Sequence, residues 1–136
     1  HFIGNDKNMP DFLKAKVATY DLKIRGFVDL IEEELLSSEA LIVPHKQRMG
    51  FRNRIASALS LATIVISHDS AVAGMPDLIS GDNCFLFNGP KEFKNIIQKL
   101  ATTNHLKIQK NAFKTFKTKY HHDPIHTITS FVRKNA

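Results

Sequence analysis

ALIVPHKQRMGFRNRIASALSLATIVI, residues 40–66, contains the alternation on which the fold depends. Its two ends, Ala40–Val43 and Thr63–Ile66, are short apolar runs rich in Ile and Val, which is typical of strands buried in a parallel sheet. Between them, apolar residues recur at i, i+3, i+4 and i+7 and predict a helix over residues 51–62: Ile55, Ala58, Leu59 and Ala62. The order strand, helix, strand predicts a parallel βαβ unit.

The same alternation continues on both sides of this stretch. Three further apolar runs are predicted as strands: Phe2-Ile3, Leu22–Ile24 and Cys84–Phe87. Helical patterns are predicted at residues 11–19, 28–36, 90–101, 104–119 and 124–134. We therefore predict an α/β fold with a doubly wound parallel sheet of about five strands. The 136 residues suit a single domain, 1–136, in which 104–136 is a C-terminal helical segment.

Composition excludes several classes of protein. Hydrophobic residues make up 43% of the chain and charged residues 24%, which is a globular rather than a disordered composition. No apolar run is long enough to span a bilayer. The one cysteine, Cys84, excludes an internal disulfide framework, and its apolar surroundings predict an inert core position. The chain starts at His1 without a signal-peptide pattern, so we expect a cytoplasmic location and a piece of a longer protein.

The charge is unevenly distributed along the chain. Residues 1–89 carry nine basic and eleven acidic side chains, whereas residues 90–136 carry ten basic and two acidic ones. Five lysines follow one another without an intervening acid: Lys107, Lys110, Lys114, Lys117 and Lys119. A solvated helix face is the first interpretation, attraction to an anionic membrane surface is the second, and nucleic acid is disfavoured.

The loop after Ala40–Val43 is the strongest local signal for a ligand site. Open parallel sheets bind ligands beyond the carboxyl ends of their strands. This loop holds four cations and no acid: Lys46, Arg48, Arg52 and Arg54. With Gly50 just before a helix, it predicts a site for a phosphate or diphosphate. A basic surface loop whose arginines pair with Glu32–Glu34 is the alternative.

Motifs for other chemistries are absent or weak. Neither G-x-G-x-x-G nor G-x-x-x-x-G-K-[ST] occurs, which disfavours a nicotinamide dehydrogenase and a P-loop ATPase. His45 and His68 follow strand ends, but we favour ordinary loop histidines over ligand contacts. The cluster His121, His122, Asp123 and His126 matches no standard zinc spacing, so no metal site is predicted.

An ordered series of motifs resembles a known family over residues 22–100. The series runs Ile24-Arg25-Gly26-Phe27-Val28, Ala40–Pro44, Gly50–Ile66, Gly74–Leu78 and Gly81–Gly89. It resembles the C-terminal, donor nucleotide-binding half of GT-B fold glycosyltransferases of the "glycosyl transferases group 1" type. The resemblance implies a Rossmann-like domain that forms one half of a GT-B fold, with the N-terminal acceptor domain missing from this chain.

The family resemblance also implies an activity. Such a domain binds a nucleotide-diphosphate sugar, from which a hexosyltransferase-like enzyme transfers the sugar to an acceptor in polysaccharide or glycolipid synthesis. The nucleotide sugar is the substrate, and no cofactor or metal is expected. The isolated domain is expected to be inactive because the missing N-terminal domain supplies half of the cleft. A peripheral position at the inner membrane face would agree with the basic C-terminal part.

The resemblance assigns roles to particular residues. Arg54 matches the residue that stabilises charge on the departing diphosphate, and it is our candidate catalytic residue. The nucleotide sugar would lie against Arg25, Gly26, Phe27, Val28, Gly50, Arg52, Ser57, Gly74 and Met75, with backbone amides contributing near the last two and near Gly50.

Two positions depart from the family pattern. Its paired acids, spaced E-x7-E, fall at Met49 and Ser57, and a serine cannot accept two ribose hydroxyls as a carboxylate does. Two alternatives therefore stay open: a non-catalytic nucleotide or sugar-phosphate binding module, and a basic interaction module for an anionic membrane.

Overall fold

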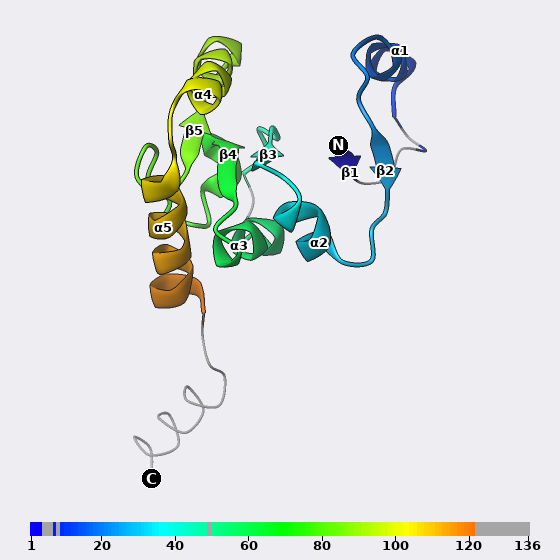
Figure 1. Ribbon diagram of the computed structural model, residues 1–136. Helices are drawn as coiled ribbons and strands as arrows, with labels where there is room; N and C mark the ends of the chain where they lie inside the picture. Colours follow the sequence, from blue (N-terminus) through cyan, green and yellow to red (C-terminus); the bar gives the residue numbers. More distant parts are fainter. Residues whose placement is uncertain (4–6, 8, 49, 122–136) are drawn as a thin grey trace. The chain divides into compact units, whose positions relative to one another are not determined.

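The structure is a computed structural model that describes residues 1–3, 7, 9–48 and 50–121 (Figure 1). The described residues divide into two compact units, His1–Ile31 and a second that starts at Glu32. The helix predicted at 124–134 lies outside the described residues.

The first unit is a short parallel strand pair with one helix. Strand β1 (Phe2–Ile3) pairs with β2 (Ile24–Gly26), and α1 (Asp11–Thr19) connects them. The predicted helix at 11–19 is confirmed. Asp11 supplies a negative charge in the first turn, where it complements the helix dipole and lies 3.3 Å from Lys14 Nζ.

The second unit contains a three-stranded parallel sheet. Its strands are β3 (Ala40–Val43), β4 (Ile64–His68) and β5 (Phe85–Phe87), in that order across the sheet. All five residues of the central strand β4 are buried, so both faces of the sheet are covered. The α/β parallel fold is thus confirmed, with the five predicted strands paired as a sheet of two and a sheet of three.

The helices of the second unit begin and end close to the predicted positions. They are α2 (Ile31–Leu36), α3 (Asn53–Ser60), α4 (Pro90–Thr102) and α5 (Leu106–Thr115). Two shorter elements accompany them: the 3-10 helix η1 (Asp69–Val72) directly after β4, and the π-helical turn η2 (Phe116–Tyr120) directly after α5. Helix α3 ends before the predicted Ala62 because Ala62 takes a φ of 55°, which reverses the chain into β4. Pro90 opens α4, as predicted from its missing N–H.

The core forms where α4 and α5 cover one face of the sheet. Side chains from alternate strand positions and both helices meet there: Ile64, Ile66, Phe85, Phe87, Ile96 and Ile108. Val65 points to the opposite face because side chains alternate along a strand, and it is also fully buried. The buried α3 residues Ile55 and Leu59 confirm the stripe predicted for that helix.

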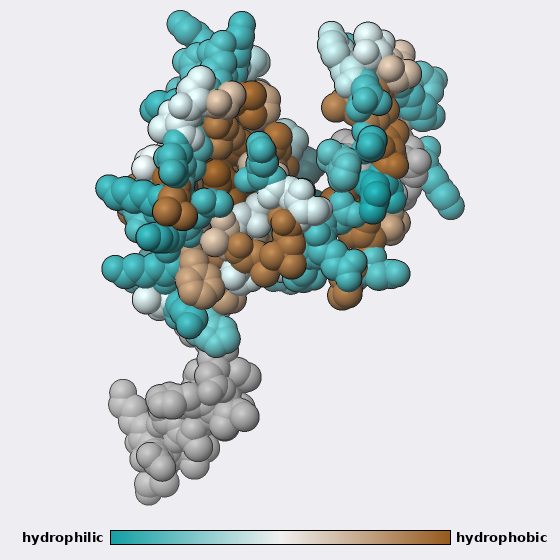
Figure 2. All heavy atoms as spheres, viewed as in Figure 1, coloured by the Kyte–Doolittle hydropathy of each residue, from teal (hydrophilic) through white to brown (hydrophobic). Residues whose placement is uncertain are grey.

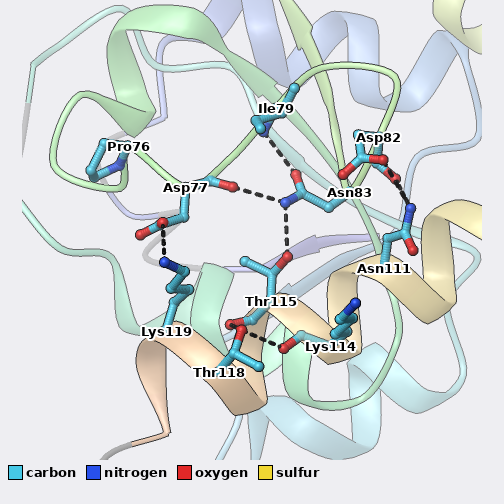
Figure 3. A pocket seen from close by; sticks show the side chains of 10 residues that line it. All are labelled: Pro76, Asp77, Ile79, Asp82, Asn83, Asn111, Lys114, Thr115, Thr118 and Lys119. Atoms are coloured by element: carbon cyan, nitrogen blue, oxygen red, sulfur yellow. Dashed lines mark hydrogen bonds and ion pairs between the residues drawn. The ribbon is translucent and has the colours of Figure 1, made fainter.

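A buried asparagine fixes the long connection between η1 and β5. Asn83 Oδ1 accepts from the Ile79 amide at 2.8 Å, and its Nδ2 donates to Asp77 O at 2.8 Å and to Thr115 Oγ1 at 2.9 Å (Figure 3). The Asn83 side chain therefore links two positions of this loop, Asp77 and Ile79, and ties the loop to α5. The sequence showed no signal for this role, because Thr115 is 32 residues away.

Replacing Asn83 should therefore destabilise the fold. We expect Asn83→Ala to lower the free energy of unfolding by about 2–3 kcal/mol, because buried partners lose their hydrogen bonds. Urea denaturation measures this change. The control Asn111→Ala removes only the bonds to the exposed Asp82, and a cost for it as large as for Asn83→Ala would contradict the assignment.

Candidate functional site

Two loops of the second unit leave the sheet at the carboxyl ends of neighbouring strands. Residues 44–52 follow β3, and residues 69–75, which include η1, follow β4. Strands β3 and β4 are parallel and adjacent, so their carboxyl ends lie at the same edge of the sheet. This edge is where a ligand was predicted.

The backbones of the two loops touch at a pair of glycines. A Cβ placed on Gly74 would lie 2.5 Å from Gly50 C and 2.8 Å from Gly50 O. No side chain fits at that separation, so the approach depends on glycine at position 74. Gly50 and Gly74 were both predicted site residues, and the structure brings them into contact.

Arg52 joins the same two loops through hydrogen bonds. Its Nε donates to Ala71 O at 2.9 Å, and its Nη2 lies 3.5 Å from Gln47 O. The side chain is half-buried. The sequence predicted a phosphate contact for Arg52 and missed this role as a clamp between the loops, which depends on a carbonyl 19 residues away.

Arg54 lies in the first turn of α3 and lines an open hollow of about 420 Å³. The other lining residues are His45, Gln47, Phe51, Arg52 and Asn53. Within the described residues no carboxylate forms an ion pair with Arg54, and no side chain caps the start of α3. The first amides of a helix lack intrahelical partners and carry the positive end of its dipole. This end of the hollow is therefore suited to an anion.

Ser57 lies one turn beyond Arg54 and contacts a carboxylate from α2. Its Oγ donates to Glu32 Oε1 at 3.1 Å. If the loop were only a basic surface loop, Glu32 was expected to form an ion pair with its arginines. Instead, Glu32 accepts a hydrogen bond from Ser57. No local pattern in the sequence marks Glu32 as a site residue, because this contact joins positions 25 apart.

The structure limits what Met75 contributes. The side chain is 1% exposed, and its amide donates to Val72 O at 2.8 Å. That amide was predicted to face the diphosphate, but here it closes the turn after η1. Met75 therefore anchors the loop that carries Gly74.

Four predicted site residues belong to the first unit. Gly26 ends β2 with a φ of 65°, in the left-handed region that favours glycine. Phe27 is 83% exposed, Val28 is half-buried and Arg25 is exposed. Their contribution to nucleotide binding stays a prediction, as does every binding role assigned above.

The two histidines at the strand ends differ in environment. His45 is exposed in the wall of the hollow. His68 is the last residue of β4 rather than a loop residue, and it is 4% exposed. Its Nδ1 lies 2.8 Å from Asp69 Oδ1, and its ring packs edge-on against Phe87. The buried His68 therefore serves the packing of the strand end.

Burial raises the pKa values of two further side chains, Cys84 and Tyr120. Burial, with the nearby charge of Asp82, raises the pKa of Cys84 to about 12, and the thiol is fully buried as predicted. The ring of Tyr120 packs edge-on against Phe51 of the hollow. Burial first, and then the charge of Asp77, raises the pKa of Tyr120, so both groups stay protonated at neutral pH.

The described part of the chain contains neither a metal-binding cluster nor a membrane-spanning helix. There, no group of three His, Cys, Asp or Glu side chains is arranged to hold a metal ion. The residues for which no metal site was predicted fall largely outside that part, since His122, Asp123 and His126 are not described. Over the same residues, no helix has the length and apolar character needed to cross a bilayer.

Comparison with known proteins finds one matching family and crystal structures of similar fold. The sequence profile described as "Glycosyl transferases group 1" matches residues 1–103. The fold is similar to crystal structures of Anabaena HepE in complex with UDP and glucose (TM-score 0.73) and in complex with UDP (TM-score 0.74), each at 19% identity. The alignments cover 98% of this chain but only 38% and 39% of those chains. No curated protein matches the sequence.

The glycine contact gives a steric prediction. We expect Gly74→Ala to lower the free energy of unfolding by about 1–3 kcal/mol, because the new methyl group must displace the backbone of Gly50. The control is Gly89→Ala, where a Cβ meets nothing within 4 Å and φ is −163°. Chemical denaturation of both variants tests the claim, and equal stabilities would show that the loops do not depend on this approach.

Proposed function

The chain belongs to the glycosyl transferases group 1 family, and on this premise we propose that it binds the nucleotide-diphosphate sugar donor of a hexosyltransferase. The full-length protein would transfer the sugar to an acceptor in polysaccharide or glycolipid synthesis. The chain spans less than half the length of the HepE chains that it matches. In this proposal the acceptor site belongs to an N-terminal domain outside this chain, and the domain alone is expected not to turn over.

The observation that carries this proposal is the position of Arg54 at the start of α3. Arg54 lines the hollow at the uncapped start of this helix, and Arg52, which also lines it, bonds to the loop that carries Gly74. A diphosphate gains negative charge as the bond to the sugar breaks. Fixed positive groups at that position stabilise this charge more strongly in the transition state than in the bound donor. Arg54 would thus act as the catalytic residue, with Arg52 holding the loops.

Glu32 and Ser57 are proposed to hold the ribose. Ser57 follows Arg54 by three residues, about 4.5 Å along the helix axis, which suits the step from a diphosphate to its ribose. A serine hydroxyl alone offers too few acceptors for the two ribose hydroxyls. The carboxylate of Glu32, whose Oε1 lies 3.1 Å from Ser57 Oγ, supplies the further acceptor oxygens. UDP is the first nucleotide to test, since HepE was crystallised with it.

Ser57, which stands where the family pattern has an acid, favours one alternative function, a binding module without catalysis. A non-catalytic nucleotide or sugar-phosphate binding module would retain Arg54 and tolerate the loss of an acid at position 57. Sugar transfer by the full-length protein separates the two functions: nucleotide binding without any transfer would favour the module.

We also propose a cytoplasmic location for this domain. The proposal is supported by the single cysteine, whose buried thiol needs no oxidising compartment. Nucleotide sugars as substrates agree with the same location.

Removing Arg54 tests the anion site. We expect Arg54→Ala to weaken binding of the preferred nucleotide diphosphate by about tenfold to hundredfold, because a charge-assisted hydrogen bond contributes about 1.5–3 kcal/mol. Calorimetric titration with UDP, GDP and ADP measures the effect. The matched control is Arg48→Ala, an exposed arginine of the same loop that does not line the hollow. Equal affinities of the Arg54 variant and the native protein would remove Arg54 from the site.

The ribose assignment has its own test. Glu32→Ala should weaken UDP binding about threefold to tenfold, and the loss should be smaller for 2′-deoxy-UDP or 3′-deoxy-UDP, which lacks the hydroxyl that Glu32 accepts from. Glu33→Ala, on the exposed side of the same helix, serves as the control. An identical loss for all three nucleotides would contradict a ribose contact.

A further inference from the structure

Helix α5 has two faces of opposite character. Ile108 and Ala112 are buried against the rest of the second unit. Four exposed lysines recur at intervals of three and four residues on the other side and continue into η2: Lys107, Lys110, Lys114 and Lys117. We call these four residues the basic strip. Their Cα atoms extend over about 15 Å of helix.

The basic strip carries more positive charge than the acids beside it, since Lys114 shares one hollow with only two carboxylates, Asp77 and Asp82. Within the described residues, no carboxylate forms an ion pair with any of the four lysines. The acids nearby have other partners: Asp77 lies 3.4 Å from Lys119, and Asp82 accepts from Asn111 Nδ2 at 2.9 Å. Four like charges along one face produce a positive potential that favours an anionic partner.

Two large apolar side chains are exposed beside these charges. Leu106 is 52% exposed and Phe113 is 40% exposed. By helical spacing, both lie along the same side as Lys110, and Lys117 Nζ is 5.3 Å from the centre of the Phe113 ring. Figure 2 shows hydrophilic side chains over the outer side of this part of the molecule, with apolar atoms between them.

We propose that this face of α5 and η2 docks on an anionic membrane surface. Lysines beside exposed Leu and Phe are typical of helices that lie in the plane of a bilayer interface, where apolar side chains enter the acyl boundary and lysine stems extend toward the headgroups. Nucleic acid is the weaker match. The strip contains no arginine, the residue that grips phosphates in a bidentate manner, and Leu106 and Phe113 have no role on a phosphate backbone.

The membrane surface goes beyond the proposed function, because the basic strip shares no residue with the hollow of Arg54. Docking would hold the nucleotide-binding domain at the bilayer surface. The two sites can therefore be tested separately.

Vesicle flotation of the full-length protein tests this proposal. We expect binding to phosphatidylcholine vesicles that contain phosphatidylglycerol, and little binding to phosphatidylcholine alone. Replacing Lys110, Lys114 and Lys117 by Glu should weaken binding by at least tenfold, since each lysine near an anionic surface contributes about fivefold. The matched control replaces the exposed α4 lysines Lys91, Lys94 and Lys99 by Glu, which changes the net charge equally. Phe113→Ala should weaken the binding that remains at high salt.

UDP titration of each variant reports whether the domain is still folded and separates a failure of membrane docking from a failure of nucleotide binding. The native protein gives a check that needs no variant: binding must fall as salt rises, because the Debye length shortens from about 10 Å at 0.1 M to about 3 Å at 1 M. Equal binding to neutral and anionic vesicles, or equal losses in the α4 and α5 variants, would overturn the proposal. So would binding to duplex DNA without binding to vesicles.

Discussion

The close approach of two backbones, at Gly50 and Gly74, is the constraint on which the candidate site depends. It joins the loop after β3 to the loop after β4, and Arg52 secures the same junction through Ala71 O at 2.9 Å. Together the two contacts hold the start of α3 close to η1. Arg54 itself lies in the first turn of α3, and the hollow that it lines is formed by the loop after β3 and the start of that helix.

The sheet beneath the site supplies the rigidity that this contact needs. All five residues of β4 are buried, and Ile64 and Ile66 pack with α4 and α5 while Val65 occupies the opposite face. Interiors packed in this way do not deform continuously, so the carboxyl ends of β3 and β4 keep their spacing. The same sheet also positions the basic strip of α5. Ile108 and Ala112 are buried and hold the helix in place, so the lysines on its other side face the solvent.

Prediction from sequence succeeded where the signal was local and periodic. The helix over 11–19, the stripe of α3 and the proline start of α4 follow from spacing and from the missing N–H of proline. It was weaker at element ends, since α3 stops two residues early at a positive φ on Ala62. It was weakest for single polar contacts. The links from Asn83 to Thr115, from Arg52 to Ala71 and from Ser57 to Glu32 join positions 19 to 32 residues apart, and no pattern in the chain marks them.

The sequence by itself determined that the chain alternates short buried strands with helices, and that cations and glycines follow the strand ends. Those properties follow from residue type and periodicity, which act over a few neighbours. Only the tertiary structure decided which of those residues meet. The Met75 amide donates to Val72 O, Arg52 Nε donates to Ala71 O, and Ser57 Oγ donates to Glu32. These contacts depend on how separate elements pack against one another, and that packing is a property of the whole fold.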